Sequence, residues 1–398
     1  MAVGYNPRIV TDGLVLALDG ANYKSFKGEA TTNVVTNTNL DTGWSKTYNT
    51  NIQWNDYPPP DNVDSQVVSF VDSDSNGSGY WYSYGDYAPQ SPSTTYTISV
   101  YARTIGSNWS IRAYTADNSE TGRQWTNTVT VPGDGKWYRV VFNSITTPAD
   151  TQSDSLSFYF SSIPAGQRCW LCAPQMEAKS YATTFTTGTR GTTVATGGGW
   201  KDLVGSNSGQ LVNGVRESTD GGGSLVFDGT NDYVNIGSGT GINQFSDDFT
   251  VSAWVMRLSG EGTWGNIIGD YYTNTVNTTN EWQLAMSSSA AFFLYRVGTG
   301  YVISSTSSGY STSEWINVVV SRIGQKISMY ANNNLIATAT NSEVFGTATG
   351  NLNVGIDGNN SSEPHSGRIS NVMIYKNKGL TAEEVQQNFD ALRGRFGI

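Results

Sequence analysis

The chain has 398 residues, of which 44 are glycine, 22 are tyrosine and only 14% are charged. This length exceeds one ordinary hydrophobic core, so two domains are expected. The formal net charge is −10 and no cluster of four Lys or Arg residues occurs, which argues against duplex-DNA binding through phosphate neutralisation. The sequence also contains no apolar run long enough to cross a membrane and no recognisable secretory signal.

The first expected element is a strand at Leu14–Leu18, which is apolar at nearly every position. A continuous apolar run of this length indicates burial on both faces or at a sheet junction. Polar and glycine-containing residues 19–28 then end the strand.

Residues 30–190 contain eight short segments with strand-like alternation, separated by turn-forming residues. The expected strands are Gln66–Val71, Gly79–Tyr84, Thr95–Arg103, Ser110–Thr115, Thr126–Val131, Trp137–Asn143, Ser155–Phe160 and Arg168–Ala173. Eight such strands predict an antiparallel jelly roll. The margins, Glu29–Asn39 and Thr183–Gly199, are rich in small polar residues and are expected to be hinge loops.

Two cysteines, Cys169 and Cys172, form a CxxC motif in the last of these strands. A redox pair and half of a zinc site are the functional alternatives. A zinc site needs a second pair of ligands, and the only histidine is His365. Residues three apart on a strand point to opposite faces, so two unpaired strand cysteines are expected.

The second half of the chain opens with two short strands around a turn, both within Gly221–Ile236, and a further strand at Phe249–Val255. The later expected strands are Glu281–Met286, Ala291–Val297, Tyr301–Thr306, Trp315–Arg322, Lys326–Ala331, Asn334–Thr340, Leu352–Ile356 and Gly367–Tyr375. Turn-forming residues punctuate this series, as in an antiparallel sandwich.

One helix is expected near the C-terminus. Thr381 and Glu384 have the spacing of a capping box, in which each side chain accepts a backbone N–H at the start of a helix. Val385, Phe389 and Leu392 then form one apolar stripe at helical spacing.

The runs SLVFDGTNDYV and FTVSAWV, the hairpin at 315–336 and the C-terminal strand and helix resemble laminin-G-like, concanavalin A-like lectin domains. In such domains a W-x-D-L-x-G segment closely follows the first strand. Here this segment is Trp200–Gly205, far from Leu14–Leu18. The resemblance therefore implies that residues 1–28 and 192–398 form one domain, interrupted by an inserted domain at 29–191.

The opening residues 37–44 and closing residues 173–182 of the insert resemble the first and last strands of jelly-roll carbohydrate-binding modules. The closing stretch, continued through residues 183–190, resembles the form that these modules take in phage tail and virion proteins, and the start at 6–19 resembles domains common in phage structural proteins. The tail at 392–398 resembles an ending of structural proteins of large tailed bacteriophages, especially cyanophages. The expected fold is thus all-β, with two antiparallel sandwiches and one short helix.

The same resemblance implies a decoration, fibre, collar or tail protein on the virion surface, assembled in the host cytoplasm. It would form homo-oligomers, contact other virion proteins and meet host-surface glycans, without nucleic-acid binding or membrane insertion. Release by lysis fits the lack of a secretory signal. The alternative is a free or cell-surface carbohydrate-binding protein, with a glycoside hydrolase as a distant third.

Catalysis is not expected. Retaining glucanases place two carboxylates about 5 Å apart, typically through an E-x-D-x-E pattern on one strand. Glu281, Glu314 and Glu343 have no acidic partner two or four residues later, and His365 has no convincing serine-elbow partner.

Sugar binding is favoured instead, because sugar sites combine flat aromatic rings with planar polar groups. The candidate residues are Tyr101, Arg103, Arg112, Tyr114, Gln124 and Trp125. Tyr101, Arg112, Tyr114 and Trp125 are expected to form one glycan-facing surface. The alternative is that these side chains decorate a solvated sheet or pack on a neighbouring subunit.

Three other tryptophans, Trp44, Trp109 and Trp137, are expected in the core. Calcium is the ion that both resembled families commonly hold through carboxylates and carbonyl oxygens. The candidate ligands are Asp41 with Glu177 in the insert, and Asp228, Asp232 or Asp357 in the lectin-like part. Asp228 and Asp232 are equally well explained as turn formers, and no other cofactor is expected.

Overall fold

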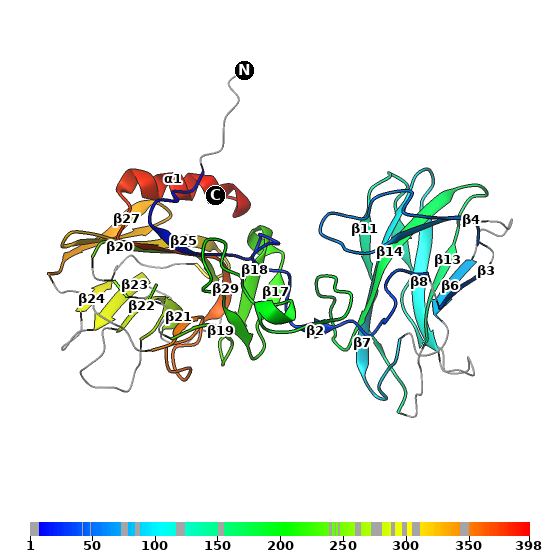
Figure 1. Ribbon diagram of the computed structural model, residues 1–398, viewed down its shortest axis with the longest axis horizontal. Helices are drawn as coiled ribbons and strands as arrows, with labels where there is room; N and C mark the ends of the chain where they lie inside the picture. The colour runs from blue at the N-terminus through cyan, green and yellow to red at the C-terminus, as the bar shows by residue number, and fades with distance from the viewer. Residues whose placement is uncertain are drawn as a thin grey trace, which may run out of the picture. The chain divides into compact units, whose positions relative to one another are not determined.

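The computed structural model describes residues 8–41, 43–47, 49–72, 79–83, 88–116, 124–149, 155–238, 241–242, 244–245, 247–258, 264–271, 281–287, 291–296, 301–304, 311–342 and 350–398. The chain divides into two compact units (Figure 1), the first made of Met1–Ala30 with Gly191–Ile398 and the second of Thr31–Arg190. The expected boundaries at 28/29 and 191/192 fall beside these. Among the described residues, no helix is both long and apolar enough to span a membrane.

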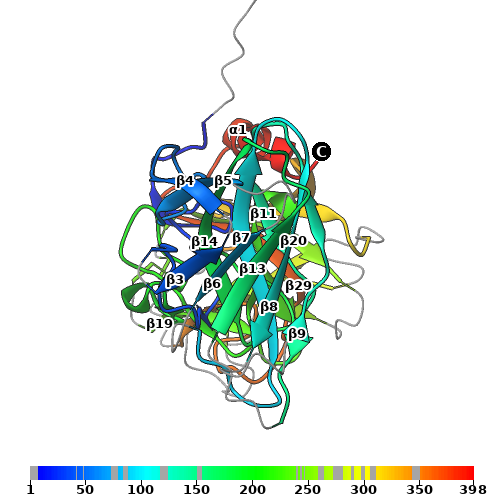
Figure 2. The ribbon, with the colours of Figure 1, turned by 90° about the vertical axis from the view of Figure 1, so that its right-hand side faces the viewer.

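The second unit is a sandwich of two six-stranded antiparallel sheets, each named here after one of its strands (Figure 2). The β8 sheet contains β3 (Trp44–Thr47), β6 (Gly79–Ser83), β8 (Trp109–Ala116), β9 (Gln124–Trp125), β10 (Val129–Val131) and β13 (Ser155–Ser161). The β7 sheet contains β4 (Asn49–Trp54), β5 (Val67–Asp72), β7 (Thr95–Thr104), β11 (Tyr138–Val141), β12 (Ile145–Thr146) and β14 (Arg168–Glu177). A separate short pair, β2 (Thr31–Thr32) and β15 (Thr189–Arg190), joins the ends of the unit.

Alternating side chains of both sheets fill the core between them. On β7, Ile98, Val100 and Ala102 point inward and are fully buried. Phe70 and Phe160 stack with ring centroids 5.0 Å apart. Trp44 and Trp109 also belong to this core, as expected.

Two expected strands differ from the structure for local reasons. Of the expected strand at 126–131 only β10 forms, and β9 precedes the expected start, because the Thr126 hydroxyl bonds both backbone groups of Ala113 and takes the chain out of the ladder. The last strand continues past Ala173 through a bulge, where Ala173 has a φ of 54° and Pro174 offers no N–H to the ladder. Three expected strands extend to Tyr84, Val297 and Thr306, and these end residues, with residue 305, lie outside the described residues.

The first unit is also a sandwich of two antiparallel sheets. Its eight-stranded sheet contains β1 (Leu14–Asp19), β17 (Arg216–Ser218), β18 (Ser224–Asp228), β20 (Phe249–Arg257), β25 (Trp315–Ile323), β26 (Lys326–Ala331), β27 (Asn334–Thr340) and β29 (Ser366–Lys376). Its seven-stranded sheet contains β16 (Gln210–Val212), β19 (Tyr233–Gly237), β21 (Gly265–Gly269), β22 (Glu281–Met286), β23 (Ala291–Arg296), β24 (Tyr301–Ser304) and β28 (Leu352–Val354). The expected all-β, jelly-roll fold is confirmed.

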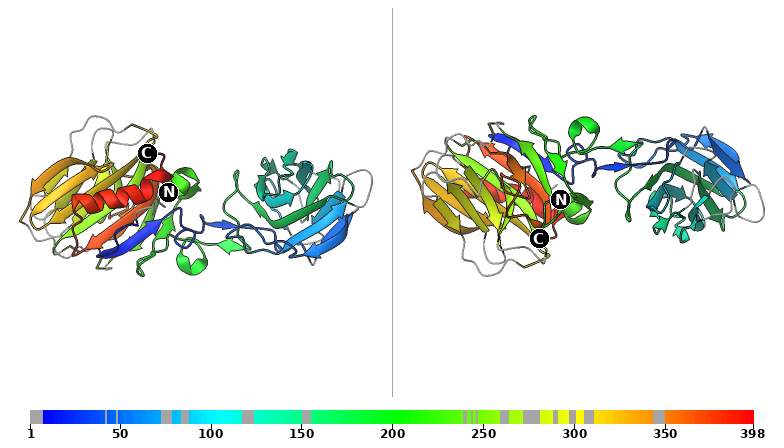
Figure 3. Two further views of the ribbon diagram at one scale, coloured as in Figure 1. Left: turned by 90° about the horizontal axis from the view of Figure 1, so that it is seen from above. Right: turned by 90° about the horizontal axis from the view of Figure 1, so that it is seen from below.

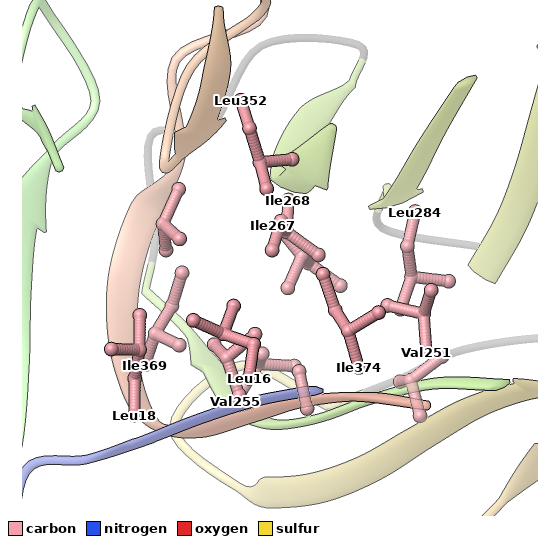
Figure 4. Packing of buried hydrophobic residues seen from close by; sticks show 14 of the residues in the cluster. Leu16, Leu18, Val251, Val255, Ile267, Ile268, Leu284, Leu352, Ile369 and Ile374 are labelled. Atoms are coloured by element: carbon pink, nitrogen blue, oxygen red, sulfur yellow. The ribbon is translucent and has the colours of Figure 1, made fainter. Parts of the chain in front are cut away.

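The N-terminal strand β1 completes this sandwich. It pairs antiparallel with β29, so that Leu16 lies opposite Ile374 and Leu18 opposite Val372. Both leucines have no exposed surface, and Figure 4 shows them among the packed aliphatic side chains of the core. The apolar character of β1 is therefore explained by long-range sheet pairing.

The helix α1 (Ala382–Leu392) covers the outer face of the eight-stranded sheet (Figure 3). The capping box is present, with the Thr381 hydroxyl accepting from Glu384 N and Glu384 Oε2 accepting from Thr381 N at 3.0 Å. Val385 is buried against this sheet, and Phe389 stacks on Trp254 with ring centroids 5.5 Å apart. The described residues also form three short 3₁₀ turns, η1 (Val194–Thr196), η2 (Asp220–Gly222) and η3 (Arg393–Arg395).

Candidate functional site

The expected sugar-binding residues lie on two different sheets of the second unit. Tyr101 and Arg103 are on β7, whereas Arg112 and Tyr114 are on β8. On each strand the intervening alanine points into the shared core, so the two pairs face outward from opposite sides of the sandwich. The expectation of one surface containing Tyr101, Arg112, Tyr114 and Trp125 is therefore wrong.

Four residues of the β8 sheet form one group, here called the Trp125 cluster: Arg112, Tyr114, Trp125 and Tyr159. Tyr114 lies opposite Trp125 in the strand pair, and their ring centroids are 4.3 Å apart. The Arg112 guanidinium lies 3.8 Å from the Trp125 ring centroid and 4.7 Å from that of Tyr159. Arg112 thus covers one face of the indole and Tyr114 is buried, so much of this aromatic area is used within the protein. Gln124 lies beside the cluster, opposite Thr115.

The β7 sheet carries a second group, here called the Tyr57 surface: Tyr57, Arg103, Trp137 and Trp170. The Arg103 guanidinium lies 3.6 Å from the Tyr57 ring centroid and 4.5 Å from that of Trp170. Arg103 Nε also donates to the Gly135 carbonyl at 2.7 Å. Arg103 is 4% exposed whereas Tyr57 is 36% exposed, so the arginine supports the tyrosine ring from the protein side and leaves part of it in solvent.

Asp56 anchors the loop that carries Tyr57. Its carboxylate accepts from Trp170 Nε1 at 3.2 Å and from the Ser69 hydroxyl at 2.7 Å, and it lies 3.8 Å from the Arg168 guanidinium. These contacts hold the loop against the sheet, so the ring of Tyr57 occupies a defined position.

Trp137 lies beside Tyr57, with ring centroids 6.4 Å apart, and its Nε1 donates to the Pro58 carbonyl at 3.0 Å. The indole is half-buried on the outer face of the β7 sheet. The expectation that Trp137 belongs to the core is wrong, because Trp137 precedes β11 and packs on the outside of the sheet. Tyr101 packs on the same outer group.

Sequence reasoning missed that Tyr57, Trp137 and Trp170 form a group on the outer face of the β7 sheet. The available signal was the run Trp54-Asn55-Asp56-Tyr57 followed by three prolines, which marks an aromatic-bearing loop after a strand. Alternation alone does not show that this loop folds back over the sheet.

An open polar cavity of about 790 Å³ lies in the same unit. Its lining is Thr36, Asn37, Thr38, Asn39, Asp41, Asn55, Asp64, Ser65, Gln66 and Thr187. Asn55 and residues 64–66 flank the loop segment that carries Tyr57, so one loop contributes to both the aromatic surface and the polar cavity. The volume lies in the range of small-ligand pockets, and its amides and carboxylates are suited to bonding hydroxyl groups.

The expected calcium ligands of the insert are engaged by protein donors. Glu177 is fully buried and accepts from the Thr31 hydroxyl at 2.6 Å, from Thr183 N at 2.9 Å and from the Thr183 hydroxyl at 2.5 Å. Asp41 accepts from Asn37 Nδ2 at 2.8 Å and lines the polar cavity. Among the described residues, no group of three or more His, Cys, Asp and Glu is arranged to hold a metal ion.

The expected ligands of the first unit hold turns. Asp228 accepts from Thr230 N at 2.8 Å, and Asp232 accepts from Gly214 N at 2.7 Å and from Asp228 N at 3.1 Å. Burial raises the pKa of Asp232. Asp357 accepts from the backbone N–H groups of residues 361 and 362. These contacts agree with the turn-forming alternative and leave calcium binding as a prediction.

Neither cysteine forms a disulfide, and both are fully buried. Cys169 lies in the core, whereas Cys172 lies in the group on the outer face of the β7 sheet. Burial raises the pKa of the Cys172 thiol. The expectation of two unpaired strand cysteines on opposite faces is confirmed.

Comparison with solved structures shows similar chains at low sequence identity. The Ruminococcus gnavus IT-sialidase CBM40 bound to α2,3-sialyllactose has 16% identity and a TM-score of 0.31, over 35% of this chain and 81% of that one. A second similar structure is Domain 4 of AbnA, a GH43 extracellular arabinanase from Geobacillus stearothermophilus, in complex with arabinotriose. It has 16% identity and a TM-score of 0.40, and the match covers 48% of this chain and 92% of that one. The binding domain of botulinum neurotoxin serotype G has 13% identity and a TM-score of 0.39, and the match covers 47% of each chain.

No curated protein sequence matches the chain. Residues 228–386 match the family described as the concanavalin A-like lectin/glucanases superfamily. These residues include β20, β25 and β29, at the centre of the eight-stranded sheet, and β22 and β28 of the facing sheet. The chain therefore contains a concanavalin A-like lectin/glucanase domain within its first unit.

Proposed function

We propose that this protein is a non-catalytic glycan-binding protein and that the Tyr57 surface of the second unit contacts the sugar. The observation that carries the proposal is the packing of Tyr57 on the Arg103 guanidinium, which also lies over Trp170, on a loop whose Asn55 lines an open polar cavity of about 790 Å³. This arrangement combines an exposed ring with nearby amides and carboxylates.

The Tyr57 ring is supported before any ligand arrives. Arg103 holds it from the protein side, and Asp56 fixes its loop through Trp170 and Ser69. Ligand binding therefore costs little side-chain ordering at this position. The C–H face of a sugar ring can pack on Tyr57 or on the half-buried Trp137, while its hydroxyls bond the polar cavity.

The Trp125 cluster of the same unit is less suited to sugar binding than the Tyr57 surface. The Arg112 guanidinium already covers one face of Trp125, and Tyr114 is buried. The cluster therefore provides a matched control, because it presents the same residue types on the opposite sheet.

A glycan array on the intact chain, followed by calorimetric titration of the best ligand, tests this assignment. Tyr57→Ala and Trp137→Ala should each weaken binding by about 1 kcal/mol, or roughly fivefold, as expected for one aromatic contact. Trp125→Ala should leave affinity unchanged. The reverse pattern, with loss only in Trp125→Ala, would place the site on the β8 sheet and contradict the proposal.

The non-catalytic part of the proposal is supported by the sequence, which lacks the paired carboxylate pattern of retaining glucanases. It is tested by incubating the pure protein with every polysaccharide that it binds and measuring new reducing ends. Release of reducing sugar that scales with protein concentration would contradict it.

A finer proposal is that the chain is an oligomeric structural or adhesive component of a bacteriophage virion. The resemblance of residues 6–19, 183–190 and 392–398 to phage structural proteins supports this role. Mass spectrometry of purified particles should then detect the chain at a fixed copy number, and light scattering should detect a homo-oligomer. Its absence from the particles would favour the free or cell-surface carbohydrate-binding protein.

A further inference from the structure

A second cavity, of about 280 Å³, lies in the first unit between residues 23–27 and 194–201. The two segments are far apart in sequence but meet where Phe26 and Trp200 form an isolated antiparallel bridge. Both of these aromatic side chains are buried. Three lysines, Lys24, Lys27 and Lys201, belong to its lining.

We propose that this cavity binds one acidic sugar unit, with its carboxylate at the three lysines and its ring against the apolar wall. The cavity belongs to the first unit, so this inference does not depend on the Tyr57 surface of the second unit.

The concentration of positive charge is unusual for this chain. Three of its 23 Lys and Arg residues line one small cavity, although its formal net charge is −10. All three lysines are exposed, and none takes part in an ion pair within the described part of the chain. Like charges held together without a counter-ion repel one another, so an anion that enters between them is bound favourably.

The carboxylates nearest to the lysines in sequence form no ion pair with them among the described residues, and each bonds another group. Asp19 lies 3.0 Å from the Arg395 guanidinium. Asp202 is buried and accepts from Ala17 N and Val204 N, both at 3.1 Å. Glu29 is buried and accepts from the backbone N–H of residue 217 at 2.8 Å.

The frame that carries the lysines is fixed by hydrogen bonds. Lys201 N donates to the Ser25 carbonyl at 2.7 Å, and the Ser25 hydroxyl donates to the Lys201 carbonyl at 2.5 Å. On the other side, Gly197 ends the η1 turn with a φ of 83°, a conformation that favours glycine. The lysine backbones therefore have defined positions, while their long side chains can adjust to a ligand.

The apolar residues that line the cavity explain why a sugar acid fits it better than an inorganic anion. Tyr23 is 37% exposed and Val194 is 40% exposed, and both line the cavity. An inorganic anion makes no use of such an apolar wall, whereas a uronic acid has a carboxylate on a ring with C–H faces. A volume of about 280 Å³ is close to the lower limit of small-ligand pockets, which suits one sugar ring.

The test is calorimetric or NMR titration of the intact chain at low ionic strength with D-galacturonate, with D-galactose as the neutral match and inorganic phosphate as the bare anion. Galacturonate should bind at one site, at least tenfold more tightly than either control. The affinity should fall as salt is added, because the interaction is partly electrostatic.

Variants locate the site. Lys24→Gln, Lys27→Gln and Lys201→Gln should each weaken galacturonate binding severalfold, and the triple variant should abolish it. Lys326→Gln removes the same charge from an exposed strand position of the same unit and should change nothing. Unchanged thermal unfolding of the lysine variants shows that their folding is intact.

Four results would overturn the proposal. Equal binding of galactose would show that the carboxylate is not recognised, and equal binding of phosphate would show that the sugar ring is not recognised. Unchanged affinity in a folded triple variant would show that the cavity is not the site. If Tyr57→Ala alone abolished galacturonate binding, the ligand would belong to the second unit, in support of the proposed function but against this inference.

Discussion

Replacing residues 31–190 by a short Gly/Ser linker should leave the first unit folded and cooperative in unfolding. Thr31 and Arg190 lie directly opposite each other in the β2–β15 pair. Such partners have Cα atoms about 4.5–5.5 Å apart, and an extended residue spans about 3.3–3.6 Å, so a linker of about four residues closes the gap without strain.

The cores of the two units support this expectation. The main core of the first unit draws on β1, Phe26 and residues 200–374, whereas that of the second draws on residues 35–176. No buried residue is shared between these two clusters. The linker variant therefore keeps every apolar side chain of the first unit's core.

The opposite perturbation removes part of that core. Leu16→Ala and Leu18→Ala each truncate a fully buried leucine and should cost about 2–5 kcal/mol. The combined cost of the two substitutions approaches the whole free energy of unfolding of a typical domain, about 5–15 kcal/mol. Deleting residues 1–28 also removes β1, one of the strands that pair with β29, and should cause aggregation through the exposed strand edge.

Urea unfolding, followed by circular dichroism and tryptophan fluorescence, measures these effects. The linker variant should show one cooperative transition, and Leu16→Ala in that background should lower its midpoint. An unfolded linker variant, together with a well-folded deletion of residues 1–28, would refute the reasoning. The two parts of the chain would then be domains in tandem.

Three further outcomes are expected. Thr381→Ala should lower the free energy of unfolding by about 0.5–2 kcal/mol through loss of the helix cap, measured by urea unfolding. Burial raises the pKa of Glu384, but the bonds from Lys378 and Thr381 N outweigh it and lower the pKa below the unfolded value of 4.5. Its stabilisation is therefore lost as the pH falls below that value, and the unfolding free energies of Glu384→Gln and the parent should converge in acid. Cys169 and Cys172 should resist thiol reagents until urea unfolds the chain, and rapid labelling of the native protein would contradict their burial.

Short-range patterns in the sequence determined much of the local structure. The Thr381/Glu384 spacing predicted the start of α1, because a capping box is completed within one helical turn. Alternation predicted that Tyr101 and Arg103 share one face of their strand, and that Cys169 and Cys172 lie on opposite faces. The apolar run at Leu14–Leu18 predicted a buried strand for the same reason.

The tertiary structure decided which of these faces meet. Alternation defines the two sides of a strand but not the sheet that it joins, so Tyr101 and Trp125 lie on opposite sheets rather than on one surface. The Tyr57 surface depends on a loop that folds back over β14, and the basic cavity depends on residues 23–27 meeting residues 194–201. These contacts join residues distant in sequence, and their energies come from packing and hydrogen bonds that exist only once the sandwich has closed.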